Sequence, residues 1–514
     1  MDLWNTYLPA FKALAQEGKV HSFMCAYNRL NGEPCCSNTF LLQDILRKKW
    51  NFKGFIATDC GAVYDFFMFH KTAKDSIEAV AQAINAGVDN QCYGYAKAII
   101  PAIKSGLLTV KALDSAVIRL LRTKMKLGFF DADSNHPYFN IPYSIVNSKP
   151  HQEYALKMAL ESTVLLKNNG ILPLNPDKIK NKTIAVIGPN AHDPEILLGN
   201  YFGDPEHIIT PLAGIKKEFS NNKIIHVQTA LIDTPQYNPQ LDSDLALKAA
   251  NEADVIFFVG GISPRLEGED LKVTVPGFSG GDRTDLNLPD VQHQLLKRLK
   301  ATGKPIVLIL LNGSALAVNW ENENMDAIVE AWYGGERAGE AIAQILTGKY
   351  NPAGRLPITF YKSVEDIPAF DDYNMNGKTY RYFKKEVLFP FGYGLSYTKF
   401  KYKGIKLSSA NLTEHGYIDV ELRIQNTGKL DGEEVVQLYI SKEGDKYPIK
   451  ELKGFQRLFV KAGSHKKVLI RLNGSDLEYY DGVVDDLTFQ KGKAQLMVGP
   501  SSGSSIKTFK INLN

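Results

Sequence analysis

Asp59 closes a short apolar run in the sequence GFIATDCGAV (54–63). A short apolar run bounded by glycines predicts a buried strand, and α/β folds place ligands and catalytic groups at the carboxyl ends of such strands. On the local pattern alone, capping of the helix that follows is the simpler interpretation of Asp59. The surrounding sequence has to decide between these two roles.

A second acidic group lies in the segment SPRLEGEDLKVTVPGFSGGDRTDLNLP (263–289), which contains Glu267, Glu269 and Asp270. This segment follows a predicted strand directly, and irregular loops of such length inside compact domains are usually functional. Two other interpretations are a solvated acidic loop and a metal site, although the D-x-D-x-D-G spacing of a calcium loop is absent. The segment is therefore a candidate for a functional loop.

Length and charge limit the class of protein. The chain has 514 residues, of which 44% are hydrophobic and 23% charged, and its net charge is +4. This is globular material, long enough for about three domains. A charge so close to balance indicates neither a nucleic-acid partner nor an anionic membrane surface. No apolar run reaches the ~18 residues of a membrane span, and the first residues form an amphipathic pattern without a signal peptide.

The first 128 residues alternate predicted strands and helices. Strands are predicted at 20–28, in the run that ends at Asp59, and at 86–92; helices are predicted at 1–20, 39–50, 72–86 and 95–128. Such alternation indicates βαβ units and a parallel sheet. Three strands tipped by acids or amides resemble the last part of a (β/α)8 barrel, which closes only with eight strands. We therefore expect the chain to begin within a larger barrel.

Two further regions follow. Buried strands, each followed by glycine and a helical pattern, are predicted at 183–190, 254–261, 305–313 and 325–335, which indicates a doubly wound α/β sheet. Residues 401–514 alternate with a period of two, as in an immunoglobulin or fibronectin-like β-sandwich. The predicted boundaries are 1–128 for the partial barrel, 129–182 for a linker and helix, 183–362 for the α/β domain, 363–400 for a second linker and 401–514 for the sandwich.

All five cysteines lie in the first fifth of the chain: Cys25, Cys35, Cys36, Cys60 and Cys92. Their number is odd, and their spacing fits no zinc site. We interpret them mainly as buried thiols, with a disulfide at Cys35 or Cys36 as the alternative.

Ordered motifs along almost the whole chain resemble glycoside hydrolase family 3, the β-glucosidase and β-xylosidase family. They are MCAYNRLNGEPCCSN (24–38), GFIATDCGAV (54–63), ESTVLLKNNGILPL (161–174), IAVIGPNA (184–191), LGNYFG (198–203), GGDRTDLNLP (280–289), WYGGERAGEAIAQILTGKYNPAGRLPITF (332–360), LFPFGYGLSYT (388–398), NTGKLDGEEVVQLYI (426–440) and ELKGF (451–455). The T-D-C form of the motif around Asp59 resembles the xylosidase-like branch, because the glucosidase form has tryptophan at the position of Cys60.

The resemblance implies an architecture and a set of roles. The family combines a (β/α)8 barrel, an α/β sandwich and a fibronectin type III-like domain. Its members are exo-acting β-glycosidases that retain the anomeric configuration, a reaction that needs two carboxyl groups about 5–5.5 Å apart. Asp59 matches the nucleophile, and Glu269 is the best match for the general acid/base, with Glu267 as runner-up and otherwise a substrate-binding residue. Tyr27 and Cys60 would line the sugar site.

The same resemblance implies the partners. The substrate would be a xylo- or gluco-oligosaccharide with a terminal β-D-xylosyl or β-D-glucosyl residue. No metal or organic cofactor is required, no nucleic acid is involved, and a homodimer and a periplasmic or secreted location are expected. A dinucleotide site is not expected, because the turn after the strand at 184–188 is Pro-Asn-Ala and lacks G-x-G-x-x-G.

The chain departs from the family pattern in one respect. Residues that the family draws from barrel strands one to five, among them a sugar-binding aspartate and a lysine-histidine pair, have no counterpart here. We therefore expect about five βα units to be absent. The alternative function is an inactive fragment or carbohydrate-binding remnant of such an enzyme.

Overall fold

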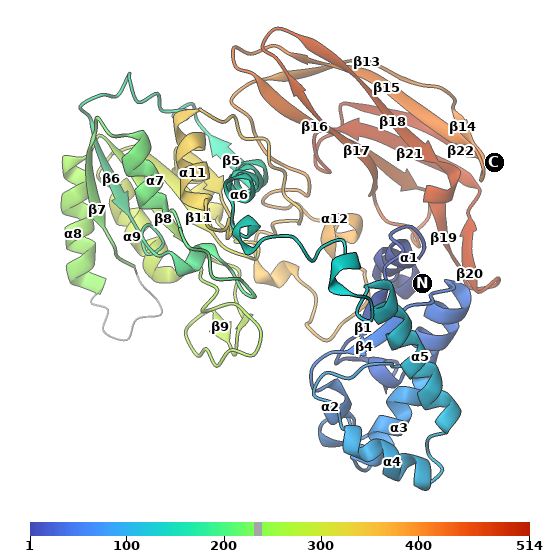
Figure 1. Ribbon diagram of the computed structural model, residues 1–514. Coiled ribbons are helices and arrows are strands. Elements are labelled where there is room, and N and C mark those ends of the chain that lie inside the picture. Colours follow the sequence, from blue (N-terminus) through green and yellow to red (C-terminus); the bar gives the residue numbers. More distant parts are fainter. Residues whose placement is uncertain (231–238) are drawn as a thin grey trace. The chain divides into compact units, whose positions relative to one another are not determined.

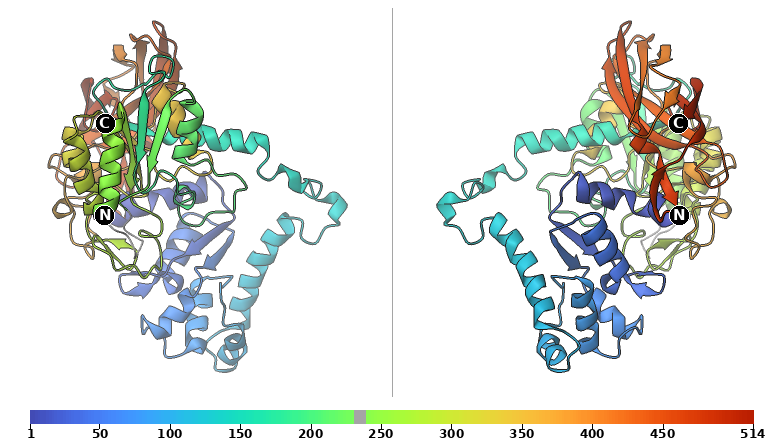
Figure 2. Two further views of the ribbon diagram at one scale, coloured as in Figure 1. Left: turned by 90° about the vertical axis from the view of Figure 1, so that its left-hand side faces the viewer. Right: turned by 90° about the vertical axis from the view of Figure 1, so that its right-hand side faces the viewer.

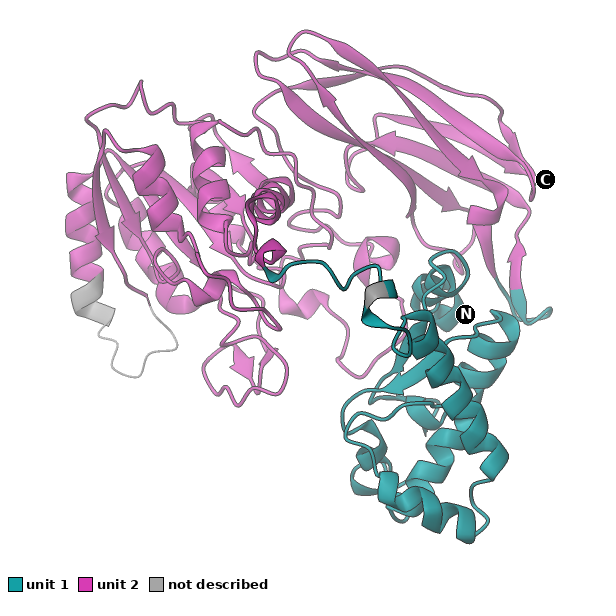
Figure 3. Ribbon diagram, in the orientation of Figure 1, with its two compact units in different colours: residues 1–143, 480–486 teal, residues 144–479, 487–514 magenta. Residues whose placement is uncertain are grey.

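The computed structural model describes residues 1–230 and 239–514. The chain divides into two compact units (Figure 3). Unit 1 contains Met1–Tyr143 and Tyr480–Asp486, and unit 2 contains Ser144–Tyr479 and Leu487–Asn514. Among the described residues, no helix combines the length and the apolar composition needed to cross a membrane.

Unit 1 is built around two parallel strands, β1 (Ser22–Cys25) and β4 (Phe55–Thr58), paired from Ser22↔Phe55 to Cys25↔Thr58. Around them lie the helical segments η1 (Leu3–Tyr7), α1 (Pro9–Gln16), η2 (Cys35–Ser37), η3 (Phe40–Lys49), α2 (Ala62–Met68), α3 (Ser76–Ala86), α4 (Ala96–Lys104) and α5 (Val110–Lys126), and the short strands β2 (Arg29–Leu30) and β3 (Glu33–Pro34) (Figure 1). The predicted alternation of strands and helices is therefore present.

The predicted third strand at 86–92 is wrong. This segment contributes one isolated bridge, between Ala57 and Asn90. The physical reason lies in Asp89, whose carboxylate accepts a hydrogen bond from the Ile56 N–H at 2.9 Å. In a regular strand pair, a backbone carbonyl of the neighbouring strand would accept this N–H. The segment therefore follows β4 for one residue pair only.

Unit 2 contains a six-stranded sheet in the order β5-β12-β11-β8-β6-β7. Its strands are β5 (Val164–Asn168), β6 (Thr183–Ile187), β7 (Lys223–Val227), β8 (Val255–Gly261), β11 (Ile306–Leu311) and β12 (Ala327–Glu330). All neighbours run parallel except β5, which is antiparallel to β12. The four central strands were predicted. The edge strands β5 and β7 were not, since edge strands lack the continuous apolar run of a strand covered on both faces.

Helices cover both faces of this sheet (Figures 1 and 2). Ile256 and Phe258 of β8 belong to one apolar cluster, which also includes residues of α8 (Pro239–Glu252) and α9 (Asp290–Lys300). Phe257 and Val259 belong to a second cluster with α7 (Pro211–Glu218) and α11 (Ala338–Thr347). Successive strand residues point to opposite faces, so the sheet is buried on both sides. The other α-helices among the described residues of this region are α6 (Lys149–Ser162), α10 (Asn319–Asn324) and α12 (Thr379–Tyr382), and short 3-10 helices lie at η5 (Tyr143–Ile145), η6 (Glu195–Leu197) and η7 (Val364–Asp366).

The last part of unit 2 is a β-sandwich, as predicted. One sheet has the order β13-β15-β18 and the other β14-β22-β21-β16-β17. The strands are β13 (Phe400–Leu407), β14 (Asn411–Leu412), β15 (Tyr417–Asn426), β16 (Gly432–Lys442), β17 (Glu451–Val460), β18 (His465–Asn473), β21 (Gly492–Gly499) and β22 (Lys507–Leu513). Alternate residues of both sheets meet in one apolar cluster, which is the packing that the period-two pattern predicts. Between β18 and β21 the chain forms a further two-stranded pair, β19 (Glu478–Asp481) and β20 (Asp486–Phe489), of which residues 480–486 belong to unit 1.

Candidate active site

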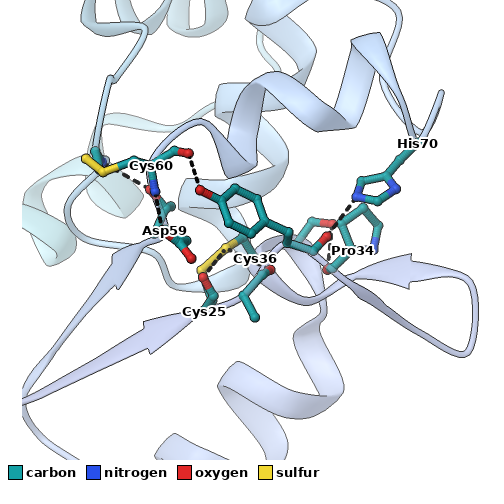
Figure 4. Close-up of a disulfide and its surroundings, with 11 residues drawn as sticks. Cys25, Pro34, Cys36, Asp59, Cys60 and His70 are labelled. Atoms are coloured by element: carbon teal, nitrogen blue, oxygen red, sulfur yellow. Dashed lines mark hydrogen bonds between the residues drawn. A yellow bond between two sulfur atoms is a disulfide. The ribbon is translucent and has the colours of Figure 1, made fainter. Parts of the chain in front are cut away.

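Asp59 lies at the carboxyl end of β4, and its carboxylate is oriented by local backbone. The Asp59 N–H donates to the carbonyl of Cys25 at 3.0 Å, and its Oδ1 accepts the N–H of Cys60 at 2.7 Å (Figure 4). Helix α2 begins three residues later with Gly61 at its N-cap and without a side-chain cap. The capping interpretation of Asp59 is therefore wrong, since its carboxylate accepts the Cys60 N–H before the helix begins.

Tyr27 comes to the same segment from the loop after β1. Its hydroxyl donates to the carbonyl of Cys60 at 2.5 Å, and its own carbonyl lies 2.8 Å from Nε2 of His70. The structure thus brings the predicted site residues Tyr27, Asp59 and Cys60 together. His70 was missed, because nothing in its local sequence links it to a tyrosine 43 positions away.

The cysteine prediction is wrong for four of the five residues. Cys25 pairs with Cys36, and Cys60 pairs with Cys92. Only Cys35 is a free buried thiol, and burial raises its pKa. The alternative of a disulfide at Cys36 is confirmed. Sequence spacing did not reveal the pairs, because Cys36 returns to the end of β1 through the hairpin of β2 and β3, and Cys92 reaches the end of β4 only after α2 and α3.

Behind β4 lies a buried ion-pair cluster. The Asp89 side chain is fully buried and contacts Arg47 and Arg119, each at 2.7 Å. Burial lowers the pKa of Arg47, and the charge of Asp89 opposes this effect. Asp89 was one of the acids expected at a strand tip, but its carboxylate is engaged by these two arginines and by the N–H of Ile56. It therefore supports the strand that carries Asp59.

In unit 2, the predicted functional loop 263–289 follows β8 and folds back on itself through the short hairpin β9 (Phe278–Ser279) and β10 (Asp282–Arg283). The N–H of Gly268 donates to the carbonyl of Gly281 at 3.2 Å. Gly281 has φ +145°, and a Cβ atom at this position would lie 2.2 Å from the carbonyl oxygen of Gly268. Glycine is therefore required where the two halves of the loop touch.

Glu267 fastens this loop to the sheet. Its Oε1 accepts hydrogen bonds from the N–H of Gly313 and the hydroxyl of Tyr333, both at 2.7 Å. Its Oε2 accepts the hydroxyl of Ser314 at 2.6 Å, and Arg283 donates to that hydroxyl oxygen at 3.0 Å. Burial, and then the Glu267 charge, raise the pKa of Tyr333, so this phenol stays a neutral donor. Both oxygens of Glu267 are thus held in place.

Glu269 has a different environment. It is exposed to solvent and accepts a hydrogen bond from the hydroxyl of Tyr201. The loop that carries Tyr201 is tied to the same segment, since the side-chain amide of Asn200 donates to the carbonyl of Glu267 at 3.0 Å. The clamp at Glu267 therefore fixes the backbone from which Glu269 projects.

A buried carboxyl group that sequence reasoning missed lies at the end of β12. Glu330 is 0% exposed, and it accepts hydrogen bonds from the side chain of Asn312 and the N–H of Trp332, both at 3.1 Å. Burial raises the pKa of Glu330 to about 8, the two hydrogen bonds oppose this rise, and the charge of Glu267 adds to it. Its only sequence signal was a single acid within an apolar strand.

Among the residues that the structure describes, no group of three or more His, Cys, Asp or Glu side chains could hold a metal ion. Of the predicted catalytic carboxyl groups, Asp59 in unit 1 is half-exposed and Glu269 in unit 2 is exposed.

Three family models match the chain in the predicted order of regions. They are the glycosyl hydrolase family 3 N-terminal domain over residues 1–123, the glycosyl hydrolase family 3 C-terminal domain over 163–397, and a fibronectin type III-like domain over 434–502. A xylan 1,4-beta-xylosidase of Xylanibacter ruminicola is 34% identical, with 98% of this chain and 74% of that protein covered.

Two further proteins give the same picture. A periplasmic beta-glucosidase of Salmonella typhimurium is 35% identical, with 97% of this chain and 68% of that protein covered. Among solved structures, a β-glucosidase from Erythrobacter marinus matches with a TM-score of 0.87 and 31% identity, over 99% of this chain and 69% of that one. The similarity therefore extends to both xylosidases and glucosidases.

Proposed function

The chain belongs to glycoside hydrolase family 3, and from that premise we propose that it is a retaining exo-β-glycosidase that works by double displacement. Its family makes it a glycosyl hydrolase with β-xylosidase and β-glucosidase relatives. The proposed reaction releases terminal, non-reducing β-D-xylosyl or β-D-glucosyl residues from oligosaccharides. The observation that carries the proposal is the Asp59 carboxylate at the carboxyl end of β4, oriented by the Cys60 N–H.

In the first step Asp59 attacks the anomeric carbon and displaces the leaving oxygen, which forms a covalent glycosyl-enzyme. A nucleophile has to be held in one orientation, because its effective molarity falls when the carboxylate can adopt several orientations. The hydrogen bonds from Asp59 N–H to Cys25 and from Cys60 N–H to Asp59 supply that restraint. The strand register of β1 and β4 supports it from behind.

Glu269 gives a proton to the leaving oxygen and later activates the water that hydrolyses the intermediate. This exchange of roles requires a carboxyl group that can both lose and gain a proton. Exposure to solvent and the flexible length of a glutamate favour Glu269 for this task. Glu267 is less suited, because three fixed donors engage its two oxygens; we propose that it holds the loop.

A mechanism-based inactivator tests the proposal. A 2-fluoro β-glycoside with a good leaving group forms the intermediate but hydrolyses slowly, so the sugar stays on the nucleophile. We expect peptide mass spectrometry to find the label on Asp59 and to find none in Asp59→Asn. Labelling of another residue, or no labelling with both the xylosyl and the glucosyl reagent, would contradict the proposed function.

A further inference from the structure

We propose that the Cys60–Cys92 disulfide positions the nucleophile, so that turnover depends on its oxidised state and Cys92 is a positioning residue. The inference rests on the proposed role of Asp59. Cys60 follows Asp59 directly, and its N–H is the group that orients the Asp59 carboxylate at 2.7 Å. Any shift of the Cys60 backbone therefore moves the donor that sets the direction of attack.

The backbone of Cys60 is held on two sides. On one side the Tyr27 hydroxyl donates to its carbonyl at 2.5 Å. On the other side the disulfide links its side chain to Cys92. Cys92 is joined to the same turn by its own backbone, since its N–H donates to the Thr58 hydroxyl at 3.1 Å and its carbonyl accepts the Gly61 N–H at 3.4 Å. The covalent bond thus closes a small ring of contacts around Asp59.

Apart from the disulfide, Cys92 is held by the two hydrogen bonds of its backbone, to Thr58 and Gly61. The segment 86–92 contributes a single bridge to the sheet, at Asn90. Immediately after Cys92, Tyr93 is 82% exposed and Gly94 is exposed as well. The buried side chains of Val88 and Asp89 anchor the earlier part of this segment. Cys92 lies beyond them, and the sulfur–sulfur bond ties it to the turn at Cys60.

The second disulfide provides a matched contrast. Cys25 ends β1 and Cys36 lies in η2, and they are only 4% and 0% exposed. Packing therefore holds both residues even without the disulfide, and reductants have little access to the Cys25–Cys36 bond. Cys60, by comparison, is exposed. A mild reductant should open Cys60–Cys92 first, because access governs thiol–disulfide exchange.

The reduction itself is a two-electron exchange. A dithiothreitol thiolate attacks one sulfur of Cys60–Cys92 and forms a mixed disulfide. The second dithiothreitol thiol then closes the reagent into its cyclic disulfide, and Cys60 and Cys92 are left as two protonated thiols. Buried Cys35 does not compete in this exchange, since burial raises its pKa and disfavours the thiolate.

The experiment compares turnover of an aryl β-glycoside before and after reduction, with differential alkylation to report which bond is open. A nucleophile displaced by about 1 Å can cost up to ~10²-fold in rate, so we expect kcat to fall about tenfold or more while KM changes less. Reoxidation should restore kcat. Equal kcat values with Cys60–Cys92 shown to be open would overturn the proposal.

Two double variants sharpen the comparison. Cys60→Ala/Cys92→Ala should reproduce the low kcat of the reduced protein and show no further response to reductant. Cys25→Ala/Cys36→Ala should still respond to reductant, because it keeps the Cys60–Cys92 bond. If the first variant responds or the second does not, the effect of reduction does not come from Cys60–Cys92, and the proposal is wrong.

The inactivator separates failure of this proposal from failure of the proposed function. Slower labelling of Asp59 in the reduced protein, together with faster hydrogen exchange of the Asp59, Cys60 and Gly61 amides, is the expected result. Labelling at Asp59 at equal rates in both states overturns only the positioning role. Absence of labelling at Asp59 in the oxidised protein overturns the nucleophile assignment, and this inference with it.

Discussion

The two segments that carry the proposed catalytic carboxyl groups are held in different ways. Asp59 stands at the end of a strand, and backbone hydrogen bonds and the neighbouring disulfide restrain it. Glu269 stands on a loop, and a second carboxylate, Glu267, anchors that loop through side-chain and backbone donors. A nucleophile needs one fixed direction of attack, whereas an acid/base has to serve a leaving group and then a water. The rigid strand end suits the proposed nucleophile Asp59, and the anchored loop suits the proposed acid/base Glu269.

The buried acids behind the two segments differ as well. In unit 1, Asp89 is matched by two arginines. In unit 2, the hydrogen-bond partners of Glu330 are a side-chain amide and a backbone N–H, both neutral, and burial raises its pKa. One region therefore buries a carboxylate between two arginines, and the other buries a carboxyl group that favours its protonated form. Substitutions at these positions should consequently have different signatures.

The largest effect is expected from Asp59→Asn, which keeps the shape of the side chain but removes the nucleophile. Turnover should fall by roughly 10³-fold or more. The measurement is kcat for a nitrophenyl β-glycoside, with circular dichroism to show that the fold is kept. Asp44→Asn, on the exposed surface of η3, is the matched control and should retain activity. A loss of only a few-fold in Asp59→Asn would contradict the assignment.

Glu269→Ala should show a loss that depends on the leaving group. Natural disaccharides and alkyl glycosides need protonation, so their cleavage should slow by about 10²–10⁴-fold. An activated aryl glycoside needs little, so its first step should proceed nearly as before and deglycosylation should become limiting. Added azide, which needs no general base, should restore turnover and yield a β-glycosyl azide. Product analysis and pre-steady-state bursts measure both effects.

Glu267→Ala is the matched variant for this prediction. If Glu267 holds the loop, azide should not rescue it, and all leaving groups should suffer alike. Rescue in Glu267→Ala and not in Glu269→Ala would mean that the two glutamates are reversed. Rescue in neither would show that the acid/base lies outside the loop 263–289.

The difference between the two segments also explains what the sequence could predict. The strand carrying Asp59 was predictable because glycines and an apolar run define it locally. The four central strands of the unit 2 sheet were predictable for the same reason, since burial on both faces leaves a continuous apolar run. The partners of Glu267 were not predictable, because Gly313, Ser314 and Tyr333 lie 46 or more positions away. The disulfides were not predictable either, because the fold of the intervening segments brings Cys36 back to Cys25 and Cys92 back to Cys60.

In unit 1, Asp89→Asn should destabilise the fold strongly. The substitution leaves Arg47 and Arg119, whose side chains are 11% and 21% exposed, without their carboxylate. Breaking a buried pair by removing one partner costs about 3–5 kcal/mol. In contrast, Asp44→Asn removes an exposed i,i+4 pair with Lys48 and should cost about 0.5 kcal/mol or less. Urea unfolding measures both, and similar losses in the two variants would contradict the role of Asp89.

In unit 2, Glu330 should make stability depend on pH. Its folded pKa of about 8 lies above the ~4.3 of an unfolded glutamate, so the folded state holds the proton more tightly. The contribution is complete below about pH 4.3 and is lost as the pH rises through 8, by at most about 5 kcal/mol. Glu330→Gln cannot ionise, so its urea midpoint should fall less between pH 5 and 8.5. Equal pH slopes in wild type and variant would contradict this.

The smallest expected effect concerns the choice of sugar, and it returns to the segment around Asp59. The T-D-C form of the motif around Asp59, whose Cys60 is bound to Cys92, is the feature that resembles the xylosidase-like branch. Overall similarity does not decide the preference, because the xylosidase and the glucosidase relatives are 34% and 35% identical. The local difference at Cys60 therefore carries the prediction that β-xylosides are preferred.

The test compares kcat/KM for nitrophenyl β-xyloside and nitrophenyl β-glucoside on the same preparation, so that the amount of active enzyme cancels. The two sugars differ by one hydroxymethyl group, and pockets discriminate differences of that size by about 10–200-fold. We expect the xyloside to be favoured within this range. A clear preference for the glucoside would show that the residue after the nucleophile does not set the specificity, and that other walls of the sugar site do.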